Sequence, residues 1–291
     1  MSTSSYAPWQ ASARALAQRA GVDPRYLRRL RWLHKASAVR RKGGRLRDHA
    51  AWILTAPEPD NYTYEISNYD DLARWVACVS GVSVATAGAL VAEPATDGVL
   101  RSRLRRATAG HRWWWSFRSP AFGRRAGWYA LVRALRPRVV IEVGAHDGLG
   151  SLLLLRALER NADAPGRLIS FDVNPAAGWL VGAHPHWEMR IEDSRQGLQA
   201  LLPIVEPVDL FLYDGWHTAA AELADISTVL PSMSADGLLV SDDAQVTGAL
   251  AQIADSHQLA YHEFSERSIG HFSPGTVTAA AVRRPAAVRR P

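Results

Sequence analysis

Residues 139–152 read VVIEVGAHDGLGSL, and this stretch decides the fold class. A β-branched run ends at Val143, a turn with glycines follows, and a leucine-rich helix opens after it. In an open parallel sheet this order leaves a backbone-lined hollow at the carboxyl end of the strand, where nucleosides bind. The sequence therefore predicts an α/β fold with a nucleoside site at Gly144 and Gly148.

The glycine spacing excludes two common nucleotide sites. Dinucleotide binders need G-x-G-x-x-G, and phosphate loops need G-x-x-x-x-G-K-[ST]. Here the glycines read G-x-x-x-G-x-G, and Glu142 stands two residues before the first of them. Its carboxylate would repel a pyrophosphate but could pair with a cationic amino-acid head, so the pattern favours a nucleoside with a positively charged group.

Further strands are predicted along the chain, and acidic residues follow most of them. The segments are 168–172, ending in Asp172; 191–194, with Asp193 and Ser194; 208–214, ending in Asp214; and 237–243, ending in Asp242 and Asp243. The strands at 259–264 and 276–282 read as a final hairpin, with His271 in its loop. Carboxyl ends of parallel strands meet at one edge of a sheet, so these acids are expected to share a site.

This set of motifs resembles the class I S-adenosylmethionine-dependent methyltransferases over about the last 150 residues. The resemblance implies a Rossmann-like sheet of seven strands with an antiparallel last hairpin and helices on both faces. It implies S-adenosylmethionine as cofactor, with Asp172 on the ribose hydroxyls and Asp193 with Ser194 at the adenine edge. The implied cofactor-binding residues are Glu142, Gly144, His146, Gly148, Asp172, Asp193, Ser194 and Asp214.

Each of these acids also has a purely structural interpretation. Glu142 could interact with a helix dipole, Asp172 could end a strand in a turn, and Asp193 could cap the following helix. His146 occupies the place where the family usually has the middle glycine of this motif, which suggests that His146 or Asp147 reaches the cofactor or the substrate.

The chemistry is expected where the strands before Asp214 and Asp242 end. In the resembling metal-dependent small-molecule O-methyltransferases, typified by macrolide-sugar enzymes, an Asp and an Asp-Asp pair bind magnesium, which implies Asp214, Asp242 and Asp243 as ligands here. His217 is the candidate general base, since a neutral imidazole can take a proton near physiological pH, and Asp214 is the second candidate catalytic residue. In the structural alternative, Asp214 and Asp242 lie in turns, Asp243 caps a helix and His217 is exposed to solvent. Trp216 replaces an acidic residue frequent in such relatives, which weakens the metal prediction.

The first part of the chain reads as a separate, mostly helical region. Helical spacing is visible at residues 14–19 and 26–33, and the predicted division is 1–110 for this region and 111–291 for the methyltransferase domain. Such a region commonly forms a lid or a homodimer contact. The uncharged stretch from Trp75 to Val91 is interrupted at Ser80 and Gly81, so it predicts two short buried helices and no membrane span.

Composition bounds the remaining functions. The chain has 291 residues, a net charge of +6 and one cysteine, so no internal disulfide is possible. Residues 101–141 contain several arginines and no Asp or Glu, and Trp113, Trp114 and Trp115 lie among them. Basic and aromatic side chains together can bind the phosphates and bases of RNA, which is the basis of an RNA-binding alternative. The scarcity of lysine instead indicates the residue usage of a GC-rich genome. No G-x-S-x-G motif supports a hydrolase.

The sequence thus predicts a cytoplasmic enzyme, because no signal peptide is recognised at its N-terminus. The predicted reaction is methylation of oxygen on a small molecule such as a sugar or secondary metabolite, with magnesium as an optional aid and without nucleic-acid or membrane partners. Metal-independent N-methylation of a small molecule is the alternative within enzymes, and an RNA-binding or RNA-methylating protein is the alternative outside that class.

Overall fold

The fold is built around β2 (Val139–Val143), whose five residues are all buried. Burial on both faces is typical of a central strand in a parallel sheet, and the Val and Ile side chains favour that conformation. The computed structural model describes residues 63–109, 120–161, 166–269 and 275–283. The predicted helices at 14–19 and 26–33, the three consecutive tryptophans and His271 lie outside these ranges.

The main sheet has seven strands in the order β4-β3-β2-β5-β6-β9-β7. The other strands are β3 (Arg167–Asp172), β4 (Trp187–Ile191), β5 (Val208–Tyr213), β6 (Met233–Ser241), β7 (Leu259–Ser265) and β9 (Val277–Arg283). The first five in spatial order pair in parallel, while β9 pairs antiparallel with both β6 and β7. The predicted seven-stranded sheet with an antiparallel last hairpin is confirmed.

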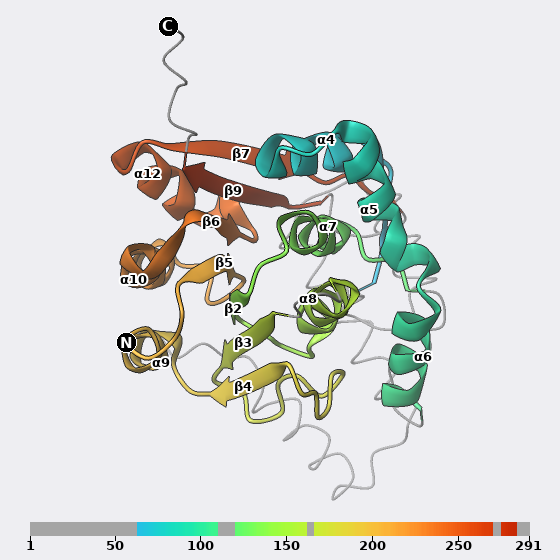
Figure 1. Cartoon of the computed structure of the whole chain (residues 1–291), viewed down its shortest axis with the longest axis horizontal. Helices are drawn as coiled ribbons and strands as arrows, with labels where there is room; N and C mark the ends of the chain where they lie inside the picture. Colours follow the sequence, from blue (N-terminus) through green and yellow to red (C-terminus); the bar gives the residue numbers. More distant parts are fainter. Residues whose placement is uncertain (1–62, 110–119, 162–165, 270–274, 284–291) are drawn as a thin grey trace, which may run out of the picture. The chain divides into compact units, whose positions relative to one another are not determined.

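Helices cover both faces of the sheet (Figure 1). On one face lie α7 (Arg125–Leu135) and α8 (Leu149–Arg160), and on the other lie α9 (Ser194–Leu201), α10 (Ala219–Val229) and α12 (Ala249–Ser256). The connections also contain the short η1 (Leu230–Ser232) and α11 (Ala244–Thr247). Two hydrophobic clusters, one on each face, hold the layers together.

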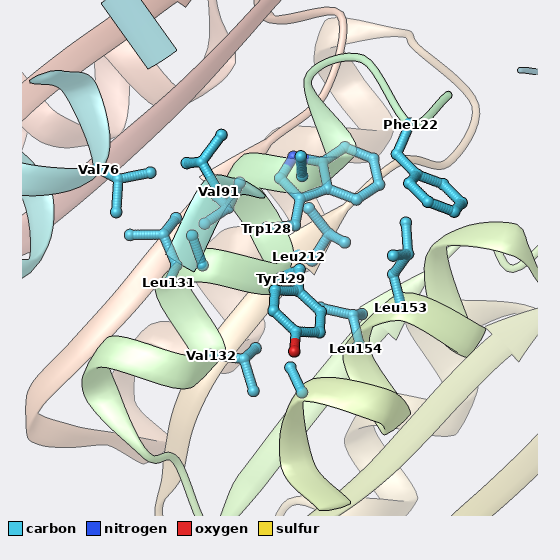
Figure 2. Close-up of a cluster of buried hydrophobic side chains, with 14 of the residues drawn as sticks. Val76, Val91, Phe122, Trp128, Tyr129, Leu131, Val132, Leu153, Leu154 and Leu212 are labelled. Carbon is cyan, nitrogen blue, oxygen red and sulfur yellow. The ribbon is translucent and has the colours of Figure 1, made fainter. Parts of the chain in front are cut away.

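The larger cluster is centred on α7, where Trp128 and Tyr129 are both buried. Figure 2 shows these rings among Leu153 and Leu154 of α8 and Val91 of α5 (Val84–Thr96). Such aromatic side chains remove a large apolar area from water, and truncating one to alanine in a core costs about 3–5 kcal/mol. This packing fixes α7, and with it the residues just before its first turn, against the sheet.

Three further helices extend the same cluster: α4 (Tyr69–Ser80), α5 (Val84–Thr96) and α6 (Gly98–Ala107). The predicted break is confirmed, since α4 ends at Ser80 and Gly81 adopts a left-handed φ of 77°. Among the described helices, no single one is long and apolar enough to cross a membrane; only the bent pair of α4 with the stretch through α6 passes that test together. The predicted boundary at residue 110 falls outside the described ranges and stays a prediction.

A small second sheet joins distant parts of the chain. Its strands are β1 (Glu65–Ile66) and β8 (Ser268–Ile269), which pair antiparallel. Asn68 strengthens the junction, because its Nδ2 donates to the carbonyl of Ser265 at 3.0 Å and its Oδ1 accepts from the amide of Arg267 at 3.0 Å. The segment before α4 is therefore fastened to the turn that follows β7.

Candidate functional site

The loops after β2 and β5 touch through their backbones, and Gly144 makes this contact possible. Gly144 has a φ of 91°, and a Cβ at this position would lie 1.9 Å from the carbonyl oxygen of Asp214. The amide of Asp214 donates to the carbonyl of Val143 at 2.8 Å. Any side chain at residue 144 would force the two loops apart, so this glycine sets the geometry of the carboxyl edge.

Glu142 lies beneath this edge and is buried, with 2% of its surface exposed. One of its carboxylate oxygens accepts from the Ser151 hydroxyl at 2.5 Å and from the Ser170 hydroxyl at 2.7 Å. Burial raises the pKa of Glu142 to about 7, against the lowering effect of both hydroxyls. The structure therefore places the carboxylate among serines in the interior, and its pairing with a cationic head stays a prediction.

Asp172 at the end of β3 organises the neighbouring loop. Its Oδ2 accepts from the amide of His146 at 2.8 Å, and its Oδ1 accepts from the amide of Asn174 at 2.8 Å. A carboxylate oxygen can accept two hydrogen bonds, so each oxygen retains a lone pair for a diol. His146 adopts a left-handed φ of 47°, which turns its amide toward Asp172, while its side chain is 59% exposed.

The predicted adenine-edge residues have structural partners. Asp193 caps α9 by accepting from the amide of Arg195 at 3.0 Å, and the hydroxyl of Ser194 donates to Asp225 at 2.6 Å. Exposed apolar side chains at the same strand ends were missed: Val173 is 50% exposed and Ile191 46%. Val173 directly follows Asp172 and Ile191 stands two positions before Asp193, so a search for polar motifs passes over both.

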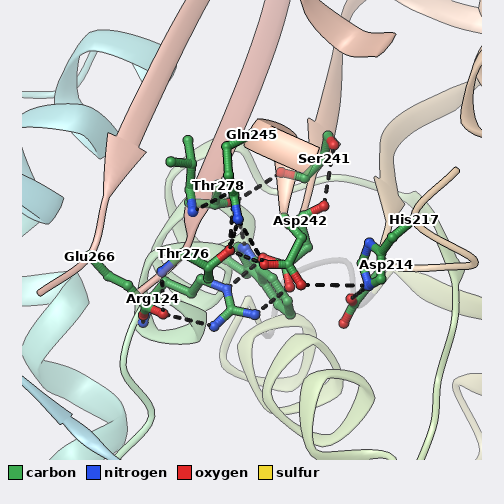
Figure 3. A network of polar contacts seen from close by, with 12 residues as sticks. Arg124, Asp214, His217, Ser241, Asp242, Gln245, Glu266, Thr276 and Thr278 are labelled. Atoms are coloured by element: carbon green, nitrogen blue, oxygen red, sulfur yellow. Dashed lines mark hydrogen bonds and ion pairs between the residues drawn. The ribbon is translucent and has the colours of Figure 1, made fainter. Parts of the chain in front are cut away.

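Asp214, His217 and Asp243 come together at the ends of β5 and β6. Figure 3 shows the His217 side chain beside Asp214. The Nε2 atom of His217 lies 3.5 Å from Oδ1 of Asp214 and 3.6 Å from Oδ2 of Asp243. The Nδ1 atom of His217 is shielded from water and has no hydrogen-bond partner within the described part of the chain. One ring nitrogen thus faces two carboxylates, and the other is left for a further partner.

The two carboxyl groups beside His217 differ in their electrostatics. Burial and the neighbouring charge of Asp242 raise the pKa of Asp214 well above its ordinary range. Burial also acts to raise the pKa of Asp243, but the Arg124 guanidinium and a hydrogen bond from Thr276 hold it below its ordinary value. Asp243 is therefore the ionised partner of the imidazole at neutral pH.

Asp242, the third predicted metal ligand, is paired with an arginine. Its side chain is 1% exposed, and both of its oxygens accept from Arg124, through Nε and Nη2 (Figure 3). A bidentate guanidinium uses the lone pairs that face it and places a positive charge beside them. The described residues contain no group of three or more His, Cys, Asp or Glu arranged to hold a metal ion. The donor set thus does not fit the predicted magnesium site, because Asp242 is already engaged.

Arg124 itself was missed by the sequence analysis. It belongs to the acid-free segment between residues 101 and 141, which was considered as a surface for RNA. In the structure its side chain is 7% exposed, and its carboxylate partner lies 118 positions later in the chain. The adjacent Arg125 is also buried, with its guanidinium carbon 5.6 Å from the centre of the Trp128 ring. Two arginines of this segment therefore lie in the interior and not on a basic face.

Comparison with known proteins was made on this background. Residues 141–244 match a protein-family profile described as a methyltransferase domain. This part of the chain, about a third of its length, is similar to methyltransferase domains. The match runs from the middle of β2 to the first residue after Asp243, so it contains all of the sequence-predicted cofactor, catalytic and metal positions. No curated protein matches the chain significantly.

Solved structures are similar in fold to this chain at low sequence identity. An O-methyltransferase from Bacillus cereus in complex with SAH is 14% identical, with a TM-score of 0.50, covering 73% of this chain and all of that one. A protein assigned as an O-methyltransferase from Klebsiella pneumoniae is 15% identical, with a TM-score of 0.50 and coverage of 65% and 91%. The O-methyltransferase TomG from Streptomyces achromogenes, in complex with SAM, is 16% identical, with a TM-score of 0.48 and the same coverage.

Proposed function

We propose that the protein transfers a methyl group from S-adenosylmethionine to an oxygen of a small molecule, such as a hydroxyl of a sugar or secondary metabolite, with His217 as general base. The observation that carries this proposal is the position of His217. Its Nε2 lies between the carboxyl groups of Asp214 and Asp243, and its Nδ1 is unpartnered and shielded from water.

The carboxyl edge supplies suitable groups for the cofactor. The free lone pairs of Asp172 can accept from the ribose hydroxyls, and the exposed side chains of Val173 and Ile191 offer apolar contacts for adenine. The O-methyltransferase of like fold from Bacillus cereus was solved with SAH, the product of such a donor. When bound, S-adenosylmethionine would supply an electrophilic methyl group on a sulfonium sulfur.

His217 is arranged to remove the acceptor's proton. With a hydrogen on Nε2 facing ionised Asp243, the lone pair of the imidazole is on Nδ1. Because Nδ1 is shielded in this structure, the half-buried ring would have to turn to receive the proton of the acceptor hydroxyl. The acceptor oxygen would then take the methyl group, and the bound donor would supply that group and leave as neutral S-adenosylhomocysteine. Asp243 stabilises the imidazolium, which then returns its proton to water.

The surroundings of His217 favour an acceptor with apolar surface. Trp216 precedes it on the loop after β5 and is 53% exposed, and Val246 in α11 after β6 is 59% exposed. Exposed large apolar groups are informative when they flank polar reactive groups, because they contact a ligand's non-reacting face. A ring-containing hydroxyl compound would satisfy both features.

Substitution of His217 tests this proposal. His217 has a left-handed φ of 48°, a conformation that asparagine tolerates well, so His217→Asn removes the base with little backbone cost. We expect turnover of a hydroxyl acceptor to fall at least about 100-fold, because general bases contribute that much, while calorimetric affinity for S-adenosylmethionine changes less than about twofold. His257→Asn, at an exposed histidine at the end of α12, is the matched control. Unchanged turnover in His217→Asn would refute the assignment of the base, and failure of the wild type to bind the cofactor would refute the function.

Metal-independent N-methylation is the second candidate, favoured by the carboxylate of Asp243, which can attract an ammonium group near His217. Acceptor pairs that differ only in carrying a hydroxyl or an amine distinguish the two candidates. A preference for the amine in turnover would replace O-methylation by N-methylation.

A further inference from the structure

The strongest unassigned feature of the site is the buried guanidinium of Arg124. Arg124 directly precedes α7, and its carbon Cζ lies 5.8 Å from the centre of the Trp128 ring. Because Trp128 is packed in the core, this backbone position is firmly held. A buried arginine must have its donors satisfied, so its partners indicate what the charge is for.

Arg124 has polar partners on two sides. On the side of the strand ends, Nε and Nη2 donate to the two oxygens of Asp242. On the other side, Nη1 donates to Oε1 of Glu266 at 3.1 Å and to the Tyr64 hydroxyl, which itself donates to Glu266 at 2.5 Å. Glu266 lies in the turn after β7, and Tyr64 precedes β1. The Arg124 side chain thus connects the carboxyl ends of the parallel strands to the junction of β1 and β8.

The same charge acts on the reactive carboxyl groups. Arg124 lowers the pKa of both Asp214 and Asp243, although Asp214 remains raised by burial and by Asp242. A divalent cation at Asp242 would likewise place a positive charge beside these two carboxyl groups. A cation bound at Asp242 would also lie beside the guanidinium and be repelled by it.

We propose that Arg124 takes the place of a divalent cation at the carboxyl edge, as a positioning residue that makes acceptor activation by His217 independent of metal. Its fixed positive charge holds Asp242 through both carboxylate oxygens, at the position where a metal ion would bind. The catalytic consequence rests on the proposed function, whereas the exclusion of metal from Asp242 does not.

Manganese binding tests the exclusion directly, without any methyl acceptor. Electron paramagnetic resonance of the full chain with Mn²⁺ alone is expected to show no stoichiometric site in the wild type at concentrations up to about 1 mM, the weak end of the affinity range of oxygen-ligand sites. Arg124→Met is expected to gain one Mn²⁺ per chain, and the further change Asp242→Asn is expected to abolish this gain. Arg133→Met on α7, which removes an equal charge at the ion pair with Glu93, is the control and is expected to stay without a site.

A stoichiometric Mn²⁺ site in the wild type that is lost in Asp242→Asn would overturn the proposal, and this arm needs no Arg124 variant to fold. A folded Arg124→Met protein without Mn²⁺ would also overturn it, because the guanidinium would then not occupy a cation position. Turnover of the wild type is expected to be the same, within about twofold, with and without excess chelator; a loss of more than tenfold would overturn the catalytic consequence. If no acceptor is methylated at all, the proposed function fails while the Mn²⁺ results still decide the exclusion of metal.

Discussion

Replacing Glu142 by glutamine should change how the stability of the protein depends on pH. Glu142 is fully enclosed in the folded state, and burial raises its pKa from the ordinary value of 4.5 to about 7. Between these two values the folded chain keeps the proton and the unfolded chain releases it. The free energy of unfolding therefore falls as the pH rises through this window and levels above pH 7.

The size of the effect follows from the two pKa values. Moving the pKa of one group from 4.5 to about 7 corresponds to about 3 kcal/mol, the free energy that the folded state loses when the buried carboxyl must ionise. Glutamine cannot ionise and retains the shape, and the hydroxyls of Ser151 and Ser170 can rotate to accept from its amide. Relative to wild type, Glu142→Gln should thus gain about 3 kcal/mol of stability between pH 4.5 and pH 8.

Urea unfolding at half-unit steps from pH 4.5 to pH 8 measures this quantity. The difference between Glu142→Gln and wild type cancels the titration of every other group, so its change with pH isolates Glu142. Glu222→Gln, at a second buried glutamate that accepts from two hydroxyls, measures at a single pH the cost of the amide itself. A difference between Glu142→Gln and wild type that stays constant within about 0.5 kcal/mol over the whole range would refute the reasoning.

Two further substitutions test the carboxyl edge. Gly144→Ala should lower the free energy of unfolding by about 3 kcal/mol or more, because its Cβ would overlap the carbonyl oxygen of Asp214. The control is Gly182→Ala, at a φ of 68° with nothing within 4 Å, which should cost only the backbone strain of about 1 kcal/mol. Equal urea midpoints for the two variants would contradict the overlap. Asp172→Asn should weaken calorimetric binding of S-adenosylmethionine about 10- to 100-fold, since an amide cannot accept on both sides. The control is Asp209→Asn, because the Asp209 carboxylate accepts hydrogen bonds from the backbone amides of Arg138 and Val139 at the start of β2. This variant should leave the affinity for S-adenosylmethionine unchanged. An equal loss in both variants would show a general effect on folding.

The sheet could be predicted from the sequence because its signals are local. Most parallel strands are short apolar runs followed by a polar turn, as in β2 and β5, which are largely buried. The edge strand β4 is the exception, because its sequence WEMRI is mixed and none of its residues is buried. The meeting of Asp172, Asp214 and Asp243 at one edge also followed, because parallel strands share the direction of their carboxyl ends. The gathering of these acids required no knowledge of distant side-chain contacts.

The partners of those acids could not be predicted in the same way. Whether Asp242 coordinates a metal or an arginine depends on Arg124, which stands 118 positions earlier in a segment whose composition indicates only positive charge. Likewise, Glu142 faces inward because Ser151 and Ser170 lie on the elements packed against β2, which the spacing within one motif does not reveal. Long-range pairing of side chains is a property of the packed fold, so local patterns leave it open.

Backbone strain marks the same edge as the reactive groups. Within the described ranges, His146, His217 and Asp243 are non-glycine residues with φ between 47° and 52°, and they follow β2, β5 and β6, three strands adjacent in the sheet. The two other described non-glycine residues with positive φ, Arg136 and Gln258, follow α7 and α12 instead. Left-handed conformations at such residues cost of order 1 kcal/mol each and persist only where the surroundings impose them. Glycine would remove that cost at all three positions, so stability alone does not account for the side chains found there. The imidazole of His217 and the carboxylate of Asp243 lie 3.6 Å apart because both residues adopt this conformation at the ends of neighbouring strands, which ties the strain to the geometry that proton removal requires.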